Sequence, residues 1–223
     1  TNVRTAYDYD PTGNLTSITD GNKHVIRFVY DVSNRLTQET DAEGHTWQYA
    51  YDAVGNLVRR IDANGDIIDY AYDNDDLLKR IAYPDGPELS FVYDENHNQV
   101  QMVDGLGATY NAYDELDRLV ASTNHLDQRV GYTYDPASNR TSVMYPDGRV
   151  LRTEYNATGD AVRVLDPDGR AFEAAYDPTH NLTELRYPNL TQATMTYDDA
   201  GRLTSILNAQ LDGDVISSFE YTL

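Results

Sequence analysis

"FVYDVSNRLTQETDAEGHTWQYAYDAVGNLVRRIDANGDIIDYAYD", residues 28 to 73, decides the fold because it states one motif three times. Tyr-Asp occurs at residues 30–31, 51–52 and 72–73, each pair 21 residues after the last. Along the chain the motif tyrosine keeps this spacing, except for one interval of 20 and a final one of 24. Its positions are Tyr9, Tyr30, Tyr51, Tyr72, Tyr93, Tyr113, Tyr134, Tyr155, Tyr176, Tyr197 and Tyr221. Such a period indicates a repeat array, and we expect one array of about ten repeats over residues 1–223, with no separate second domain.

Each repeat contains two predicted turns. The residue four positions after the motif tyrosine is, in most repeats, of a type that adopts the left-handed conformation more easily than other residues. These residues are Gly13, Asn34, Gly55, Asp76, His97, Asp117, Ser138, Gly159, His180 and Gly201. With aspartate three residues earlier, the pattern is typical of a type I turn closed by a left-handed residue, a common hairpin loop. The same chemistry recurs ten residues later and ends at Gly44, Gly65, Gly86, Gly148 and Gly169.

The segments between the turns read as strands. Before each Tyr-Asp the sequence alternates with a period of two and an aromatic face, as in Trp47-Tyr49-Tyr51 and Ile68-Tyr70-Tyr72. The other strand of each repeat starts at a recurring leucine and is more mixed, which predicts that both of its faces are partly buried. The nineteen tyrosines are thus explained by position. We expect them to form a continuous band whose rings pack while each hydroxyl reaches solvent or a backbone carbonyl.

The predicted fold is all-β, an antiparallel meander of about ten 21-residue hairpins. Open sheets rarely exceed ~10 strands without curling or splitting. We therefore expect roughly 20 strands to curl into a spiral β-shell or solenoid-like wall, or to form a ribbon covered by another layer. The residues assigned to the structural repeat are four Tyr-Asp pairs and the five glycines of the second set of turns. They are Tyr30, Asp31, Tyr51, Asp52, Tyr72, Asp73, Tyr93 and Asp94, with Gly44, Gly65, Gly86, Gly148 and Gly169.

Composition excludes several classes of function. Thirty-seven acidic and seventeen basic residues give a formal charge of −20, which repels phosphate backbones and anionic lipid surfaces, so neither a nucleic-acid partner nor membrane insertion is expected. The absence of cysteine rules out a disulfide scaffold, a thiolate zinc site and a cysteine nucleophile. We expect no cofactor.

The repeated pattern YDxxGxLxxxxDxxGxxxxYxYD resembles the YD repeat of RHS (rearrangement hotspot) proteins, whose relatives include the BC components of bacterial Tc insecticidal toxins and the teneurins of animal cell surfaces. Residues 49–73, "YAYDAVGNLVRRIDANGDIIDYAYD", are close to a consensus unit, and the resemblance covers the whole chain. It implies a long β-sheet that spirals into a hollow shell. In bacterial members the shell encloses a C-terminal toxic polypeptide, and in teneurins it is an extracellular barrel.

The protease activity of the bacterial relatives is not carried over. Their shells close with a core region that carries a PxxxxDPxGL-type motif, whose aspartates release the toxin. The nearest strings here, "DPTGNL" at 10–15 and "DPDGR" at 166–170, lie in register as ordinary repeat turns. Asp10 and Asp166 are therefore interpreted as turn residues, and no capping segment is recognised.

Three further groups of residues could form functional sites, but the repeat pattern explains each of them better than a site does. The five histidines, His24, His45, His97, His125 and His180, fall in or beside turns. Oxygen ligands for calcium cluster in "DANGD" (62–66) and "DNDD" (73–76), but neither completes a known calcium loop. Five Asn-x-Ser/Thr strings, at Asn14, Asn139, Asn156, Asn181 and Asn189, would be glycan acceptors in a secreted eukaryotic protein, yet the repeat itself places asparagine there.

We therefore expect a non-enzymatic structural module, secreted or displayed at the cell surface, that encloses or displays a polypeptide such as a toxin. Its partners would be the remainder of a larger RHS-type chain or further copies of itself. Two alternatives stay open: an extracellular fibre or adhesin built by end-to-end stacking, and a carbohydrate-binding repeat module. Trp47, the one tryptophan, lies in the aromatic band and is the candidate carbohydrate or surface contact.

Overall fold

Within each half of the chain, strands that follow one another in the sequence pair with one another. The computed structural model describes residues 4–221, in which all regular structure is β and 21 antiparallel strands form one open sheet. The contacts divide the chain into two units, residues 1–110 and 111–223, and strand β11 (Gly107–Tyr113) contains the boundary. Among the described residues no helix could span a membrane. The predicted all-β meander of roughly 20 strands is confirmed.

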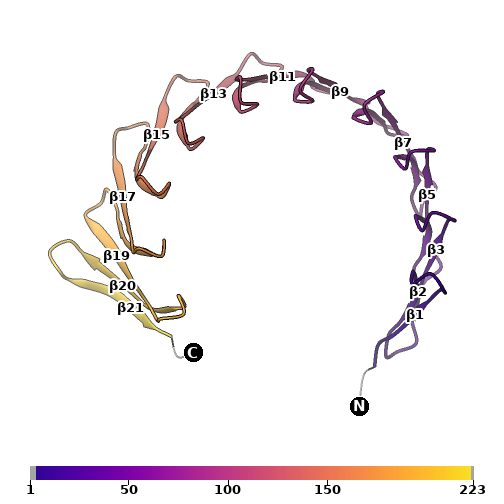
Figure 1. Cartoon of the computed structure of the whole chain (residues 1–223), viewed down its shortest axis with the longest axis horizontal. Helices are drawn as coiled ribbons and strands as arrows, with labels where there is room; N and C mark the ends of the chain where they lie inside the picture. Colours follow the sequence, from indigo (N-terminus) through magenta and orange to yellow (C-terminus); the bar gives the residue numbers. More distant parts are fainter. Residues whose placement is uncertain (1–3, 222–223) are drawn as a thin grey trace. The chain divides into compact units, whose positions relative to one another are not determined.

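The strands of the first unit are short and end at the predicted turns, and Figure 1 shows them as a single layer. They are β1 (Ala6–Tyr9), β2 (Leu15–Thr19), β3 (Val25–Tyr30), β4 (Leu36–Thr40), β5 (Thr46–Tyr51), β6 (Leu57–Ile61), β7 (Ile67–Tyr72), β8 (Leu78–Ala82), β9 (Leu89–Tyr93) and β10 (Gln99–Asp104).

The second unit repeats this pattern, again as a single layer (Figure 1). Its strands are β12 (Leu119–Thr123), β13 (Arg129–Tyr134), β14 (Arg140–Met144), β15 (Val150–Tyr155), β16 (Ala161–Leu165), β17 (Ala171–Tyr176), β18 (Leu182–Arg186), β19 (Thr191–Tyr197), β20 (Leu203–Gln210) and β21 (Val215–Glu220).

The sheet has no core of the usual kind. The buried hydrophobic residues are three alanines, Ala121, Ala193 and Ala209, which are 4%, 5% and 4% exposed, and no large side chain among the described residues is fully buried. Most strand residues are half-buried instead. Cohesion therefore comes from backbone pairing and from side chains that lie against their neighbours on the two faces of one layer.

The turns after the motif tyrosine are as predicted. All ten residues four positions after it have positive φ, including non-glycine residues such as Asn34 (61°) and His97 (68°). In the second set of turns Gly44, Gly65, Gly148 and Gly169 also have positive φ, between 81° and 92°. Gly86 departs from this pattern and does not enter the left-handed region. The next residue is Pro87, whose ring restricts the residue before it to extended conformations.

Leu190 occupies the left-handed position of its turn with φ of 64° and is 68% exposed. A Cβ at such an angle costs about 1–2 kcal/mol. We therefore expect Leu190→Gly to stabilise the chain by about 0.5–1 kcal/mol, after the larger entropy that glycine loses on folding. The melting temperature should rise.

The matched control is the reverse substitution, Gly148→Leu, at φ of 81°, where an added Cβ meets no atom within 4 Å. It should lower the melting temperature through backbone strain alone. A rise in both variants, or a fall in both, would contradict this account.

Candidate functional site: the two faces and the turn edge of the sheet

The aspartate after each motif tyrosine organises its turn. In the turn that begins at Asp31, Oδ1 accepts the backbone N–H groups of Ser33 (2.8 Å) and Arg35 (3.0 Å), and the Asp31 carbonyl accepts that of Asn34 (3.1 Å). In seven other turns the aspartate carboxylate likewise accepts the backbone N–H groups of the residues two and four positions later. These aspartates are Asp10, Asp52, Asp73, Asp94, Asp114, Asp177 and Asp198. These aspartates are turn builders, because the carboxylate replaces backbone partners that the tight turn cannot supply.

In seven repeats the motif tyrosine ties its turn to the previous repeat. The Tyr51 hydroxyl donates to the Leu36 carbonyl (2.9 Å), and the Tyr72 hydroxyl donates to the Leu57 carbonyl (3.0 Å). The same bond, to the carbonyl 15 residues earlier, is made by Tyr93, Tyr134, Tyr155, Tyr176 and Tyr197 at 2.8–3.2 Å. The expected reach of the hydroxyl to a backbone carbonyl is thus observed, and it joins one repeat to the next.

Arginine reinforces this edge in two places. Arg35 bonds Asp31 of its own turn through Nε (2.7 Å) and donates from Nη1 to the Asp52 carbonyl of the next turn (3.0 Å). Its guanidinium carbon lies 4.9 Å from the centre of the Tyr51 ring, a favourable cation–π distance. Arg118 repeats all three contacts with Asp114, Asp135 and Tyr134 in the second unit.

One face of the sheet, which we call the tyrosine face, carries the motif tyrosines and cross-strand rows that are mainly apolar. In the first unit, the strand pairing aligns Phe28 with Glu39 and Trp47, and Tyr49 with Arg60 and Ile68. In the second unit, the pairings give the rows Tyr132, Val143, Leu151; Thr153, Val164, Phe172; Ala174, Leu185, Ala193; and Met195, Ile206, Phe219. Almost all these side chains are half-buried. The tyrosine face is therefore a broad, half-exposed and mainly apolar surface, with Glu39 and Arg60 as the charged residues in these rows.

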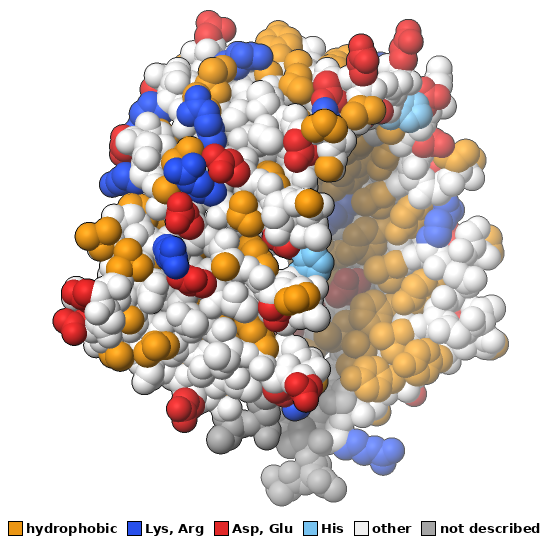
Figure 2. Space-filling model, turned by 60° about the vertical axis from the view of Figure 1, so that its left-hand side comes forward, with side chains coloured by type: hydrophobic (Ala, Val, Ile, Leu, Met, Phe, Trp, Pro, Cys, Tyr) orange, Lys and Arg blue, Asp and Glu red, His pale blue; other side chains and the backbone are white. Residues whose placement is uncertain are grey.

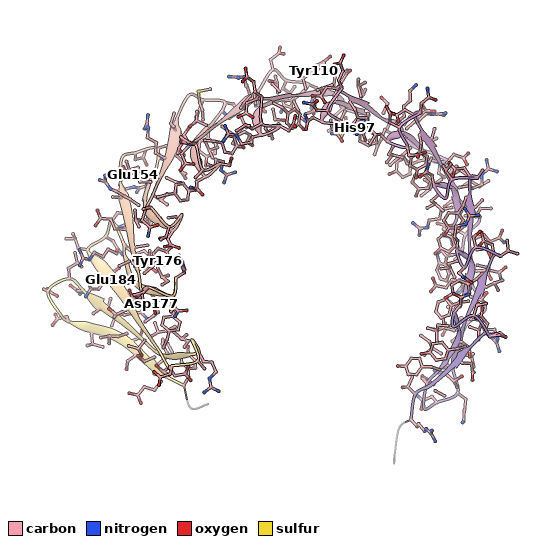
Figure 3. The ribbon with its side chains drawn as sticks, in the orientation of Figure 1. His97, Tyr110, Glu154, Tyr176, Asp177 and Glu184 are labelled. Atoms are coloured by element: carbon pink, nitrogen blue, oxygen red, sulfur yellow. The ribbon has the colours of Figure 1, made fainter. Side chains whose placement is uncertain are left out.

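The opposite face, which we call the charged face, carries ion pairs between neighbouring strands. Arg59 binds Asp69 at 2.6 Å in the first unit. In the second unit Arg163 lies between Glu154 (3.4 Å) and Glu173 (3.7 Å) of the two adjacent strands, whereas Arg186 binds Glu184 of its own strand, β18. Figure 3 shows Tyr176 and Asp177 on one side of the ribbon and Glu154 and Glu184 on the other. In the space-filling view, side chains of both charges are interspersed with hydrophobic ones (Figure 2).

The structure places the predicted residues as follows. Tyr30, Tyr51, Tyr72 and Tyr93 are half-buried at strand ends, and Trp47 is half-buried in its row on the tyrosine face. His24 and His45 each lie beside the aspartate of their own turn, with Nδ1 3.0 Å from Asp20 and 2.8 Å from Asp41. His180 instead reaches Asp160 of the preceding turn (2.7 Å).

One group of three metal-ligand types occurs among residues 4–221. Asp41, Glu43 and His45 offer ligand atoms within 4.8 Å of one another. All three belong to one exposed turn, where the Asp41 carboxylate already accepts the backbone N–H groups of Glu43 and His45. The hydrogen bonds that build the turn therefore explain why these three residues lie close together.

The sequence of the array matches the model of the RHS repeat, over residues 30–67, 72–109, 113–150, 155–192 and 176–210. These matches cover more than half of the chain. The chain belongs to the RHS repeat family. No curated protein is a match in sequence.

Solved structures of RHS-containing complexes share the fold. The crystal structure of TcdB2-TccC3 matches with a TM-score of 0.83 at 14% identity, covering 99% of this chain and 14% of that one. The structure of TcdB2-TccC3-TEV has the same score and identity, covering 99% of this chain and 13% of its own. The Tc holotoxin pore of Photorhabdus luminescens matches with a TM-score of 0.67 at 14% identity, covering 100% and 14%. This RHS array thus spans about one-seventh of the length of the chains it matches.

The sequence did not reveal the β-bulge that recurs in the RHS repeat. In the pairing of β5 with β6, Ala50 opposes Arg59 and Tyr51 opposes Leu57, so Val58 has no partner. An equivalent shift occurs at Thr37, Thr141, Val162 and others. The bulge places two successive residues on the charged face and explains why the strand after each leucine looked mixed. Its signal is a β-branched residue directly after the leucine position.

Hydrogen bonding lowers the pKa of many turn aspartates of the RHS array. The amide of Asn14, then the hydroxyl of Thr12, lower the pKa of Asp10 to about 2, and Asn181 and Thr179 do the same for Asp177. In the unfolded chain such a carboxyl has a pKa of about 3.9. Between these values the unfolded chain binds more protons, so acid favours unfolding.

We expect the melting temperature of the RHS array to be constant above about pH 5 and to fall as the pH drops towards about 2. Circular dichroism melts across this range measure it. The variant Asp177→Asn keeps an acceptor but cannot titrate. Asn156 already bonds the N–H groups of Thr158 and Asp160 in this way (3.0 and 2.9 Å). In this variant, the repeat that contains residue 177 should lose less of its protection against hydrogen exchange in acid. A wild-type melting temperature that does not change at low pH would contradict the lowered pKa values of the turn aspartates.

Proposed function

We propose that the chain is a structural segment of an RHS-type shell, a wall one sheet thick that encloses or displays another polypeptide. The observation that carries this proposal is the difference between the two faces of a sheet without a core. Large apolar side chains remain half-exposed on the tyrosine face, whereas the other face pairs its charges. A soluble single layer with such faces suits a boundary between water and a sheltered space.

The solved neighbours support the same role. They are Tc toxin complexes, and one is described as TcdB2-TccC3 without its hypervariable C-terminal region, with a TM-score of 0.61. We infer that this chain likewise forms part of a larger protein, acts outside the cell that makes it, and shelters a variable polypeptide such as a toxin. The tyrosine face would line the interior. In this role the Tyr-Asp pairs are structural and catalyse no reaction.

The experiment is limited proteolysis of the natural gene product that contains this segment, with fragments identified by mass spectrometry. Encapsulation predicts that polypeptide C-terminal to the array survives while the array is intact. It should become sensitive once the wall is opened, for example in a variant with a specific protease site inserted after Val54, a residue in an exposed turn. Rapid loss of the C-terminal part beside an intact array, or the absence of any such part, would overturn the proposal.

A further inference from the structure

The regular ion pairing of the charged face is interrupted in the second unit. A hollow of about 590 Å³ opens there, lined among others by Arg129, Gly131, Thr133, Ser142 and Arg152. Neither arginine makes an ion pair or side-chain hydrogen bond with another described residue. Arg163 and Arg186, on the same face, are both paired with glutamates. Within the second unit, the two free guanidinium groups differ in this respect from those of Arg163 and Arg186.

The position of Gly131 in its repeat explains the hollow. In two other repeats the same position is occupied by a carboxylate, Asp69 or Glu173, which binds Arg59 (2.6 Å) or Arg163 (3.7 Å) on the neighbouring strand. Glycine supplies no side chain there, and its cross-strand partner is Ala121. A Cβ built on Gly131 would lie 3.2 Å from Met144 Cε and 3.9 Å from Arg129 Nη1. The Arg129 guanidinium therefore extends over a space where two other repeats hold a carboxylate.

The neighbouring groups leave this charge uncompensated. Arg152 pairs across the strands with Ser142, and Glu154, two residues further along β15, is engaged by Arg163. The Thr133 hydroxyl lies 2.8 Å from that of Thr141 and 2.6 Å from that of Ser142. Hydroxyl donors and two guanidinium forks are the groups that bind a carboxylate.

We propose that the arginine hollow, formed by Arg129, Gly131, Thr133, Ser142, Met144 and Arg152, binds a carboxylate side chain of an acidic polypeptide segment. The incoming carboxylate takes the place that Asp69 and Glu173 fill in their own repeats. Met144 and Val150, which also line the hollow, contact the aliphatic part of the entering side chain. The site is independent of the tyrosine face, and it adds a partner on the charged face to the proposed wall.

The test uses the full 223-residue chain and a fluorescently labelled hexaglutamate peptide, with binding followed by fluorescence anisotropy at low salt. We expect Arg129→Ala and Arg152→Ala each to weaken binding about tenfold or more. Gly131→Val keeps both arginines but fills the hollow, and should weaken binding to a similar extent. The matched control Lys79→Ala removes the same charge from a strand of the first unit and should leave affinity within about twofold. Circular dichroism shows that each variant is folded.

Three results would overturn the proposal. One is the absence of peptide binding to the folded chain. Another is an equal loss of affinity in Lys79→Ala, because general attraction to positive charge would then explain binding. The third is displacement of the peptide by inorganic phosphate as readily as by unlabelled hexaglutamate, which would make the hollow a site for small anions.

Discussion

Deletion of Ala71 is expected to destabilise its repeat by about 3–5 kcal/mol, because it moves side chains from one face of the sheet to the other. In β7, Tyr70 and Tyr72 lie on the tyrosine face, and Ala71 lies between them on the charged face, opposite Arg80. Without Ala71 the two tyrosines become adjacent. Either Tyr72, or Tyr70 together with Ile68, must then leave the tyrosine face.

The matched control is deletion of Val58, the unpaired bulge residue of β6. This deletion leaves Leu57 and Arg59 on the faces they already occupy, so we expect a cost of about 1 kcal/mol, from the lost bulge and the lost side chain. Hydrogen exchange of the affected repeat, with urea denaturation of the whole chain, measures both. Equal effects of the two deletions would mean that the bulge migrates along the strand and that the register is not fixed.

Replacing Tyr72 by alanine is expected to cost about 2–4 kcal/mol. Complete burial of an aromatic ring would give about 3–5 kcal/mol, but this ring is half-buried, and its hydroxyl bond to Leu57 adds about 1 kcal/mol. Burial also raises the pKa of the Tyr72 hydroxyl, in agreement with a packed phenol. Tyr72→Phe separates the two contributions and should cost about 1 kcal/mol.

The control for Tyr72 is Tyr110→Ala, the same substitution at a tyrosine that is 54% exposed on the charged face of β11. It should cost about 1 kcal/mol or less. Local protection against hydrogen exchange is the appropriate measurement, because repeat arrays lose structure in parts. If both tyrosines proved equally dispensable, the tyrosine face would contribute no packing and the wall proposal would lose its main support.

Turns and strands were predictable because the physics that sets them is local. Residues such as Asp31, Asn34 and Gly55 predict a turn from only three or four positions of sequence. The alternation with a period of two in Trp47-Tyr49-Tyr51 predicts a strand. Gly86 shows where this reasoning fails: glycine fits a left-handed position, but the following proline disfavours that conformation, and Gly86 does not adopt it.

The bulge and the arginine hollow could not be predicted in the same way, because both depend on pairing between strands. Val58 reads as an ordinary strand residue until its partner strand is in place. Arg129 and Arg152 are 23 residues apart and share a hollow only through the register of β13, β14 and β15. For the tyrosine hydroxyl the sequence predicted either solvent or a backbone carbonyl as its partner. The structure was needed to identify the carbonyl 15 residues earlier as the acceptor.

Pairing of strands with sequence neighbours gives each unit a particular response to mechanical force. A pull on one end meets the bonds of the outermost hairpin, and the hairpins behind it carry load only after that one has detached. Each detachment releases one repeat, about 70 Å of chain at ~3.4 Å per residue. The work needed to draw the array through a narrow opening is therefore divided into small, equal steps, so a motor that generates modest force can unravel it from one end.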